Sequence, residues 1–370
     1  MLSCACSQAE SVRVLNMPRQ TRPQPDSLVP IDSDPYIGET PQESLQAWLT
    51  PNKMFYVRNH FSTPQTDDST GKLHIEGHVS RPLTLDIADI FELPKRTMPV
   101  TIECAGNNRS DLDPSVPGNP FQNGAISNAM WAGAALRDVL DMVDIEDGAV
   151  EVLFEGFDSG KPEPDVEVIP YLRSMPVDVA LHPDTLLAYE MNGEPLPVEH
   201  GYPLRLIVPG WYGMASVKWL SRIEILDHAF EGFFQTDRYV IEQDDGPAIP
   251  LSSIYVKSLI SNPQQGDVLR SGTVVVAGVA WSGSAYIKKV EVSDDGGNTW
   301  MLAELVGPCE RYTWQQWQYS WTPASPGHYT LVARAEDEAG NIQPLETKWN
   351  RLGYAINGVK PVCVTIHEVA

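Results

Sequence analysis

Residues 101–110 read Thr101-Ile102-Glu103-Cys104-Ala105-Gly106-Asn107-Asn108-Arg109-Ser110, and the rest of the chain is organised around them. The apolar residues 98–102 that lead into this stretch predict a buried strand. Gly106 and the two asparagines favour a tight turn, because these residue types tolerate positive φ. We therefore expect Cys104 at a strand end, close to the fixed charge of Arg109. A thiol beside a cation has a lowered pKa and suits a metal ligand or nucleophile, whereas a buried, inert cysteine is the structural alternative.

Composition bounds the class of protein. The chain has 370 residues, which predicts two domains, and its 42% hydrophobic content is ample for packed cores. Its 31 prolines and 27 glycines favour β structure and long loops over helical bundles. The formal net charge of −23 argues against nucleic acid or an anionic membrane as a partner. An anionic substrate would need a locally positive site.

The five cysteines do not resemble a disulfide framework, since their number is odd and they are sparse. Cys4 and Cys6 form a lone C-x-C pair, which is a weak metal signal. Neither a secretory signal nor a segment long enough to span a membrane is visible. We expect a soluble protein, in the cytoplasm rather than the periplasm or an organelle.

Four further segments combine polar side chains with strand or turn patterns. Taken singly, each also has a structural interpretation: an exposed loop, an Asx turn or a packed tyrosine. The segments are Tyr56-Val57-Arg58-Asn59-His60, Glu155-Gly156-Phe157-Asp158-Ser159, His200-Gly201-Tyr202-Pro203-Leu204-Arg205 with Ser216-Val217-Lys218-Trp219, and Phe234-Gln235-Thr236-Asp237-Arg238-Tyr239.

Taken together, these segments resemble the sulfite oxidase family. Glu103-Cys104-Ala105-Gly106-Asn107-x-Arg109 is similar to the molybdenum-ligand loop of that family, and the other segments follow in family order over roughly residues 40–360. The resemblance implies Mo-molybdopterin as cofactor and Cys104 as the protein ligand to the metal. It implies Arg58 and Arg109 as sulfite ligands and Tyr239 as a hydrogen-bond donor at the reacting centre. The implied cofactor-binding residues are Tyr56, Val57, Asn59, His60, Asp158, His200, Arg205, Ser216, Val217 and Lys218.

The predicted fold class is α+β. We expect a tail over residues 1–30, a mixed α/β domain over 31–254 with a helix at 134–143, and a second domain over 255–370. Short alternating strands with turn signals, such as residues 274–281 and 289–293, predict an antiparallel sandwich in the last part. The resemblance makes this the immunoglobulin-like dimerisation domain, and hence the protein a homodimer. Trp314, Trp317 and Trp321 are interpreted as sandwich core or dimer interface.

The implied reaction is oxidation of sulfite to sulfate, with the protein supplying binding, orientation and electrostatics. No haem, flavin or NAD domain is visible beside the cofactor domain, so electrons would pass to oxygen, to a separate cytochrome or to another acceptor. The acidic surface suits a basic cytochrome, a hypothesis that stopped-flow reduction of candidate acceptors tests.

Three positions depart from the animal enzymes of the family. Asn108 stands where those enzymes have a second arginine, and Phe121 where they have a tryptophan. The run Trp349-Asn350-Arg351-Leu352-Gly353 carries its arginine one residue early, which in a strand would turn the side chain to the opposite face. These differences leave the physiological oxyanion open.

Alternatives remain at this point. The molybdenum domain of a nitrate reductase shares these motifs, and a sulfoxide or another oxo-transfer substrate would suit a different pocket. A protein of another class, an immunoglobulin-like scaffold without metal, would leave the order of Arg58, Cys104, His200, Arg205 and Lys218 unexplained.

Overall fold

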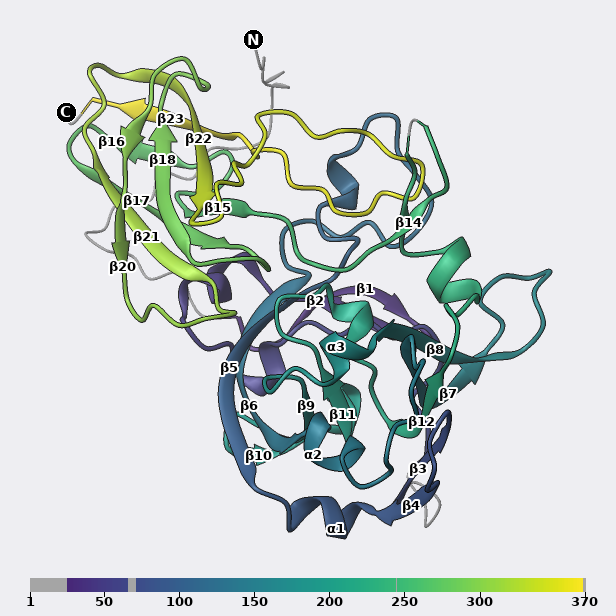
Figure 1. Ribbon diagram of the computed structural model, residues 1–370. Helices are drawn as coiled ribbons and strands as arrows, with labels where there is room; N and C mark the ends of the chain where they lie inside the picture. Colours follow the sequence, from purple (N-terminus) through teal and green to yellow (C-terminus); the bar gives the residue numbers. More distant parts are fainter. Residues whose placement is uncertain (1–24, 66–70, 244, 369–370) are drawn as a thin grey trace.

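The computed structural model describes residues 25–65, 71–243 and 245–368 (Figure 1). Cys4, Cys6 and most of the predicted tail lie outside the described residues. The first strand, β1 (Val29–Ser33), begins inside the stretch predicted as tail and pairs with β2 (Tyr36–Glu39). Among the described residues, no helix has the length and apolar character needed to cross a membrane.

Two five-stranded sheets form the first and larger module. One sheet has the order β10-β9-β6-β5, with β11 also paired to β9, and the other has the order β4-β3-β12-β7-β8. Only β3 and β12 run parallel among these pairs. The strands are β3 (Lys72–Gly77), β4 (Leu83–Asp86), β5 (Lys95–Glu103), β6 (Ile126–Ala135), β7 (Glu151–Gly160), β8 (Ile169–Pro176), β9 (Leu186–Met191), β10 (Glu194–Pro195), β11 (Arg205–Ile207) and β12 (Leu220–Leu226).

The helices described in this module are short. They are α1 (Ile87–Phe91), α2 (Leu136–Leu140) and α3 (Val177–Ala180), together with single 3-10 turns and the π-helical turn η7 (Phe233–Asp237). The helix predicted over residues 134–143 is wrong in extent, because residues 126–135 continue as strand β6 and only five residues are helical. Its apolar stripe is nevertheless core: Leu136, Val139, Leu140 and Val143 are buried.

The second module is a sandwich of two mainly antiparallel sheets, as predicted. Their orders are β15-β17-β21-β20 and β16-β23-β22-β18-β19, and the hairpin β13-β14 precedes them. The bounds are β13 (Val240–Ile241), β14 (Ile249–Pro250), β15 (Lys257–Asn262), β16 (Val268–Arg270), β17 (Val274–Trp281), β18 (Ile287–Ser293), β19 (Met301–Leu302), β20 (Glu304–Val306), β21 (Gln315–Trp321), β22 (Gly327–Asp337) and β23 (Val362–His367). The exact division at residue 255 stays a prediction.

The second module contributes residues to the main core of the first module and also has a core of its own. Trp317 and Trp321 lie in the core of the sandwich, whereas Trp281 and Trp314 pack into the main core of the first module. The Trp314 indole donates to the Trp48 carbonyl at 2.9 Å. Trp314, Trp317 and Trp321 are each at most 2% exposed, so they serve as core within one chain rather than as an interface. In Figure 1 the sandwich sits directly above strand β5, whose end carries the site described next.

Candidate active site

Cys104 immediately follows strand β5, at the position predicted for it. The backbone turns there: Asn107 N–H donates to the Cys104 carbonyl at 2.9 Å, and Arg109 N–H donates to the Gly106 carbonyl at 3.1 Å. Asn108 takes the left-handed conformation at φ 67°, which asparagine tolerates better than most residues. The thiol is 7% exposed and is held at the junction of strand and turn.

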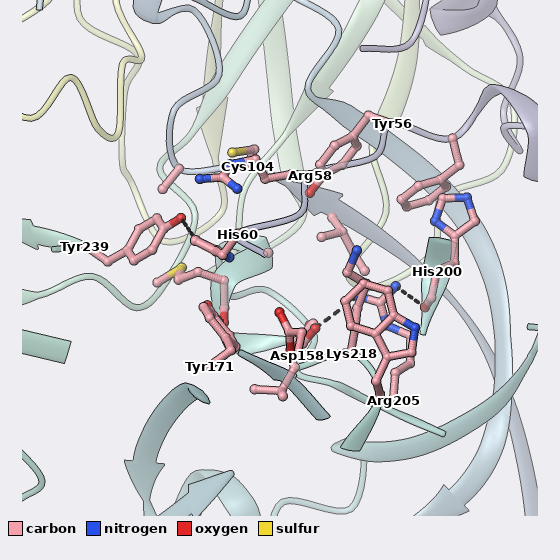
Figure 2. A pocket seen from close by; sticks show the side chains of 18 residues that line it. Tyr56, Arg58, His60, Cys104, Asp158, Tyr171, His200, Arg205, Lys218 and Tyr239 are labelled. Atoms are coloured by element: carbon pink, nitrogen blue, oxygen red, sulfur yellow. Dashed lines mark hydrogen bonds between the residues drawn. The ribbon is translucent and has the colours of Figure 1, made fainter. Parts of the chain in front are cut away.

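Two adjoining cavities meet at this thiol. The inner cavity is lined by Phe55, Tyr56, Arg58, His60, Ile102, Cys104, Ala105, Asp158, Tyr171, His200, Arg205, Gly213, Met214, Ser216, Val217, Lys218, Trp219 and Tyr239. The outer cavity, of about 500 Å³, is lined by Arg58, His60, Cys104, Arg109, Pro117, Gly118, Asn119, Pro162, Glu163, Phe233, Phe234, Arg238, Tyr239, Arg351, Leu352 and Tyr354. Only Arg58, His60, Cys104 and Tyr239 line both. Figure 2 shows these four side chains at one end of the inner cavity and Lys218, Arg205 and His200 at the other.

Buried cations define the inner cavity. The Arg205 guanidinium donates to the carbonyls of His200 (2.9 Å) and Ser216 (3.0 Å) and lies over the Trp131 ring. The Lys218 ammonium donates to the Asn59 side-chain oxygen and, at 2.9 Å, to the Glu199 carbonyl. Burial lowers the pKa of Lys218 to about 7 and that of Arg205 to about 10. Desolvation dominates both shifts, so these cations are under-compensated by the protein and suit a bound anion.

The carboxylate facing these cations is that of Asp158, on strand β7. Burial raises its pKa to about 6, although Lys218 and Arg58 oppose the shift. His200 is also buried, and desolvation together with the charge of Arg205 lowers its pKa to about 3, so its ring is neutral. One carboxylate therefore faces several basic groups, and the cavity has an excess of hydrogen-bond donors.

The residues present fit a molybdopterin group. Asn59 Nδ2 and Arg205 Nε are buried without a hydrogen-bond partner in the protein, and so is Arg109 Nε beside the outer cavity. Unpaired buried donors are costly, and a ligand rich in acceptor oxygens would satisfy them. A thiolate ligand, a cationic cradle and spare donors are the groups that a metal held by an anionic pterin needs.

His60 and Tyr239 are joined at the boundary between the cavities. The Tyr239 hydroxyl and His60 Nε2 are 2.5 Å apart, and the His60 ring stacks on Tyr171 with centroids 4.5 Å apart. Burial and the charge of Arg58 lower the pKa of His60 well below its usual value. Burial raises the pKa of Tyr239. A neutral imidazole and a protonated phenol therefore share one hydrogen bond, and the histidine tautomer decides which of them donates.

The sequence predicted a lowered pKa for the Cys104 thiol, and this prediction is wrong for the protein without bound metal. Arg58 and Arg109 do lower the pKa of the thiol, but desolvation is the larger effect and raises it overall. Proximity to cations could be inferred from sequence, whereas the depth of burial could not. A bound metal would reverse this balance, since a coordinating thiol is deprotonated outright.

Arg109 lines only the outer cavity. Its guanidinium donates to the Asn119 carbonyl at 3.0 Å and lies over the Tyr354 ring of the C-terminal segment. Arg238 and Arg351 also lie at the rim, where Arg238 pairs with the Glu163 carboxylate and Arg351 with that of Glu242 at 2.8 Å. The prediction of a reversed Arg351 in a strand is wrong, because residues 351–352 form a turn and the side chain reaches the rim from there.

The other departures from the family pattern are also placed. Phe121 is fully buried in a core cluster and lines neither cavity. Asn108 lines neither cavity. Its side chain forms hydrogen bonds with Asp111, Asn123 and Lys257 instead. Val57 lies outside both linings and pairs its backbone with Gly38, while Asn59 reaches the site through Lys218. Sequence motifs missed Tyr171, Met214 and Tyr354, because aromatic and apolar residues in such positions cannot be told from core.

The neutral buried His200 predicts a pH dependence of stability in protein prepared without cofactor. The folded-state pKa of about 3 lies below the unfolded value near 6.5, so the unfolded chain binds the proton first as pH falls. The free energy of unfolding should therefore fall as the pH drops below about 6.5, by up to about 1.4 kcal/mol per pH unit. Asp158 has the opposite effect on stability: its folded-state pKa of about 6 lies above its ordinary value of 3.8, so its contribution grows as the pH falls between these two values.

Urea unfolding of native protein and of His200→Gln between pH 7 and 4.5 measures this contribution. The Asp158 contribution is common to both proteins, so their difference isolates His200. The variant should lose less stability on acidification, and parallel curves would contradict the assignment of a neutral, buried imidazole.

Comparisons with known proteins agree with this geometry. Residues 60–234 match the oxidoreductase molybdopterin binding domain, and residues 249–366 match the Mo-co oxidoreductase dimerisation domain. The chain is similar to the structure of the sulfane dehydrogenase SoxCD from Paracoccus pantotrophus, with a TM-score of 0.77 and 29% identity over 89% of this chain and 84% of that chain. Fold and site thus define a molybdopterin-dependent oxidoreductase.

Curated relatives narrow the class. Sulfite oxidase from Arabidopsis thaliana is 34% identical to this chain. The match covers 90% of this chain and 93% of that relative. Mitochondrial sulfite oxidase from Rattus norvegicus is 36% identical over 90% of this chain, which spans 64% of that relative's length. Nitrate reductase [NADH] from Ulva prolifera is 30% identical over 90% of this chain and 42% of its own length. The chain belongs to the sulfite oxidase family.

Proposed function

We propose that this protein oxidises sulfite to sulfate at a Cys104-ligated molybdopterin centre and passes two electrons to oxygen or an external acceptor. The observation that carries the proposal is the position of Cys104 at the junction of two cavities. The inner one suits an anionic cofactor. The outer one is lined by Arg58, Arg109, Arg238 and Arg351 against one carboxylate, that of Glu163, in a protein whose net charge is −23. A positively charged cavity in an otherwise acidic protein favours a small oxyanion as its ligand.

Each side chain then has a defined task. The bound cofactor supplies the two-electron redox chemistry, for which SO₃²⁻ + H₂O gives SO₄²⁻ + 2H⁺ + 2e⁻. Cys104 would hold the metal, while Arg205, Lys218 and His200 would hold the pterin and its phosphate. Asp158, Asn59, Tyr56 and the segment Ser216–Lys218 complete that cradle, with Val57 acting through its backbone.

Arg58 and Arg109 would bind the substrate anion on the outer-cavity side of the thiol. Guanidinium groups offer paired donors that match a tetrahedral oxyanion better than ammonium groups do. The Tyr239 hydroxyl is oriented by His60 at 2.5 Å, and both side chains line the two cavities. The neutral His60 imidazole, in the tautomer that carries its proton on Nε2, would donate to the phenolic oxygen, which leaves the Tyr239 proton to donate to the bound anion.

The decisive experiment is a sulfite assay on protein produced in a host that makes molybdopterin. We expect molybdenum near one atom per chain and sulfite-dependent reduction of ferricyanide. Nitrate-dependent oxidation of the reduced enzyme, without reduction by sulfite, would instead favour the nitrate reductase relationship, and reduction by a sulfane donor alone would favour the SoxCD relationship. Either result would overturn the proposal.

A homodimer formed through the second module is part of this proposal. Residues 249–366 match a dimerisation domain, and within one chain the sandwich already buries Trp317 and Trp321, so pairing would use its outer surface. Light scattering of the purified protein should give twice the chain mass, and a monomer at micromolar concentration would contradict it.

A further inference from the structure

The residue just before Cys104 carries a buried charge that the mechanism above does not use. Glu103 is 2% exposed, and its carboxylate accepts three hydrogen bonds. The donors are Asn107 Nδ2 at 3.0 Å, Lys257 Nζ at 3.0 Å and Trp281 Nε1 at 2.9 Å. A buried carboxylate needs such compensation, because charge removed from water without partners is strongly destabilising.

Two of these donors come from the sandwich. Lys257 lies on β15 and Trp281 on β17, two neighbouring antiparallel strands on which these residues are direct partners. The Lys257 ammonium is itself 4% exposed and donates a second bond, at 2.7 Å, to the Asn108 side-chain oxygen. One ammonium group thus ties together both ends of the 103–108 turn that carries Cys104.

The C-terminal segment adds a third contact to the same turn. Ala355 N–H donates to the Ala105 carbonyl at 2.8 Å, and the Arg109 guanidinium lies over the Tyr354 ring at 5.1 Å. The turn is therefore held by the second module on several sides. The bonds that Lys257 and Trp281 donate to the Glu103 carboxylate are charge-assisted and stronger than this neutral backbone bond, so they contribute most of the restraint that the second module adds to the turn.

We propose that Lys257 and Trp281 are positioning residues, through which the sandwich fixes the direction of the Cys104 thiol by way of Glu103. Glu103 and Cys104 share a peptide unit, so contacts that hold the Glu103 side chain also restrain the start of the turn that carries the thiol. On this view the second module completes the active site as well as carrying the match to a dimerisation domain. The effect on turnover rests on the proposed function, whereas the effect on the thiol does not.

The test uses two substitutions and two matched controls. Lys257→Met keeps the length of the side chain and removes its charge, and Trp281→Phe keeps an aromatic ring and removes the N–H donor. Lys257→Arg should restore the contacts in part. Lys288→Met removes a lysine of the same sandwich whose ion pair with Glu336 lies at the surface, so it measures the cost of losing a lysine there.

The primary readout is the alkylation rate of Cys104 by iodoacetamide in protein made without cofactor, followed by peptide mass spectrometry. Cys309 is exposed and serves as the internal reference. Lys257→Met should raise the Cys104 rate relative to Cys309 by more than about ten-fold, because loss of its bonds to Glu103 and Asn108 lets the turn open and expose the thiol more often. Trp281→Phe should raise it by about ten-fold, in keeping with one lost bond to a charged group.

In the cofactor-loaded protein, kcat should fall about ten-fold in Lys257→Met with the KM for sulfite unchanged, because the anion-binding arginines are untouched. Unchanged alkylation in both variants would overturn the proposal, and Trp281→Phe decides alone if Lys257→Met does not fold. Raised alkylation without sulfite turnover in any protein would refute the proposed function and leave the positioning role standing.

Discussion

Replacing Cys104 with serine should lower sulfite turnover by more than about a hundred-fold. Loss of groups that merely orient a metal ligand already costs 10- to 100-fold, and here the ligand atom itself is removed. A serine hydroxyl at this buried position stays protonated and offers no soft sulfur to the metal. The same site raises the pKa of the thiol by desolvation, so it disfavours a free charge on any side chain there.

The free energy of unfolding should change little in the same variant. Cys104 is small, is 7% exposed and is anchored mainly by backbone bonds, such as its N–H to the Ala125 carbonyl at 2.8 Å. Cys309→Ser, at an exposed position, is the matched control and should retain activity. Molybdenum content, sulfite–ferricyanide turnover and urea unfolding are the measurements. Turnover within two-fold of native in Cys104→Ser would remove the basis of the assignment.

Replacing Arg58 with glutamine should raise the KM for sulfite by about ten- to a hundred-fold. A hydrogen bond to a charged group contributes about 1.5–3 kcal/mol, which corresponds to that range of affinity. Arg58 lines both cavities, and its charge lowers the pKa of the Cys104 thiol and of the Tyr239 phenol. The substitution therefore removes an anion ligand and also makes the thiolate harder to form, so kcat should fall as well.

Arg109→Gln and Arg81→Gln separate these two effects. Arg109 lines only the outer cavity, and its charge lowers the pKa of the Cys104 thiol less than that of Arg58 does, so its loss should act mainly on KM. Arg81 is exposed and bonds the Met142 carbonyl far along the first module, so its loss should leave both constants unchanged. Steady-state kinetics over a range of sulfite concentrations give the comparison. An Arg58 variant that behaves like Arg81→Gln would show that the outer cavity does not bind the substrate anion.

Much of the site could be predicted because its signals are local. The strand before Cys104, the turn after it and the left-handed Asn108 follow from residue types within ten positions of one another. The hairpin at Asn192-Gly193 and the alternating strands of the sandwich are local signals of the same kind. The family resemblance added what local patterns cannot give, namely that separate segments act on one cofactor.

Other features were mispredicted because a local pattern fits more than one environment. The stripe over residues 134–143 has helical spacing, yet its first residues complete strand β6 beside β9, where sheet pairing prevails over propensity. Arg351 was assigned a strand direction, but it lies in a turn and reaches the cavity rim from there.

The sequence by itself determined where the sulfur sits along the chain, which basic residues accompany it and that a sandwich follows. Only the tertiary structure decided that Lys257 and Trp281 meet Glu103 across more than 150 positions, and that burial raises the thiol pKa despite two nearby arginines. The physical reason is the distance along the chain over which each effect acts. Turn and strand preferences depend on neighbouring residues, whereas desolvation and the pairing of buried charge depend on which distant segments exclude water together.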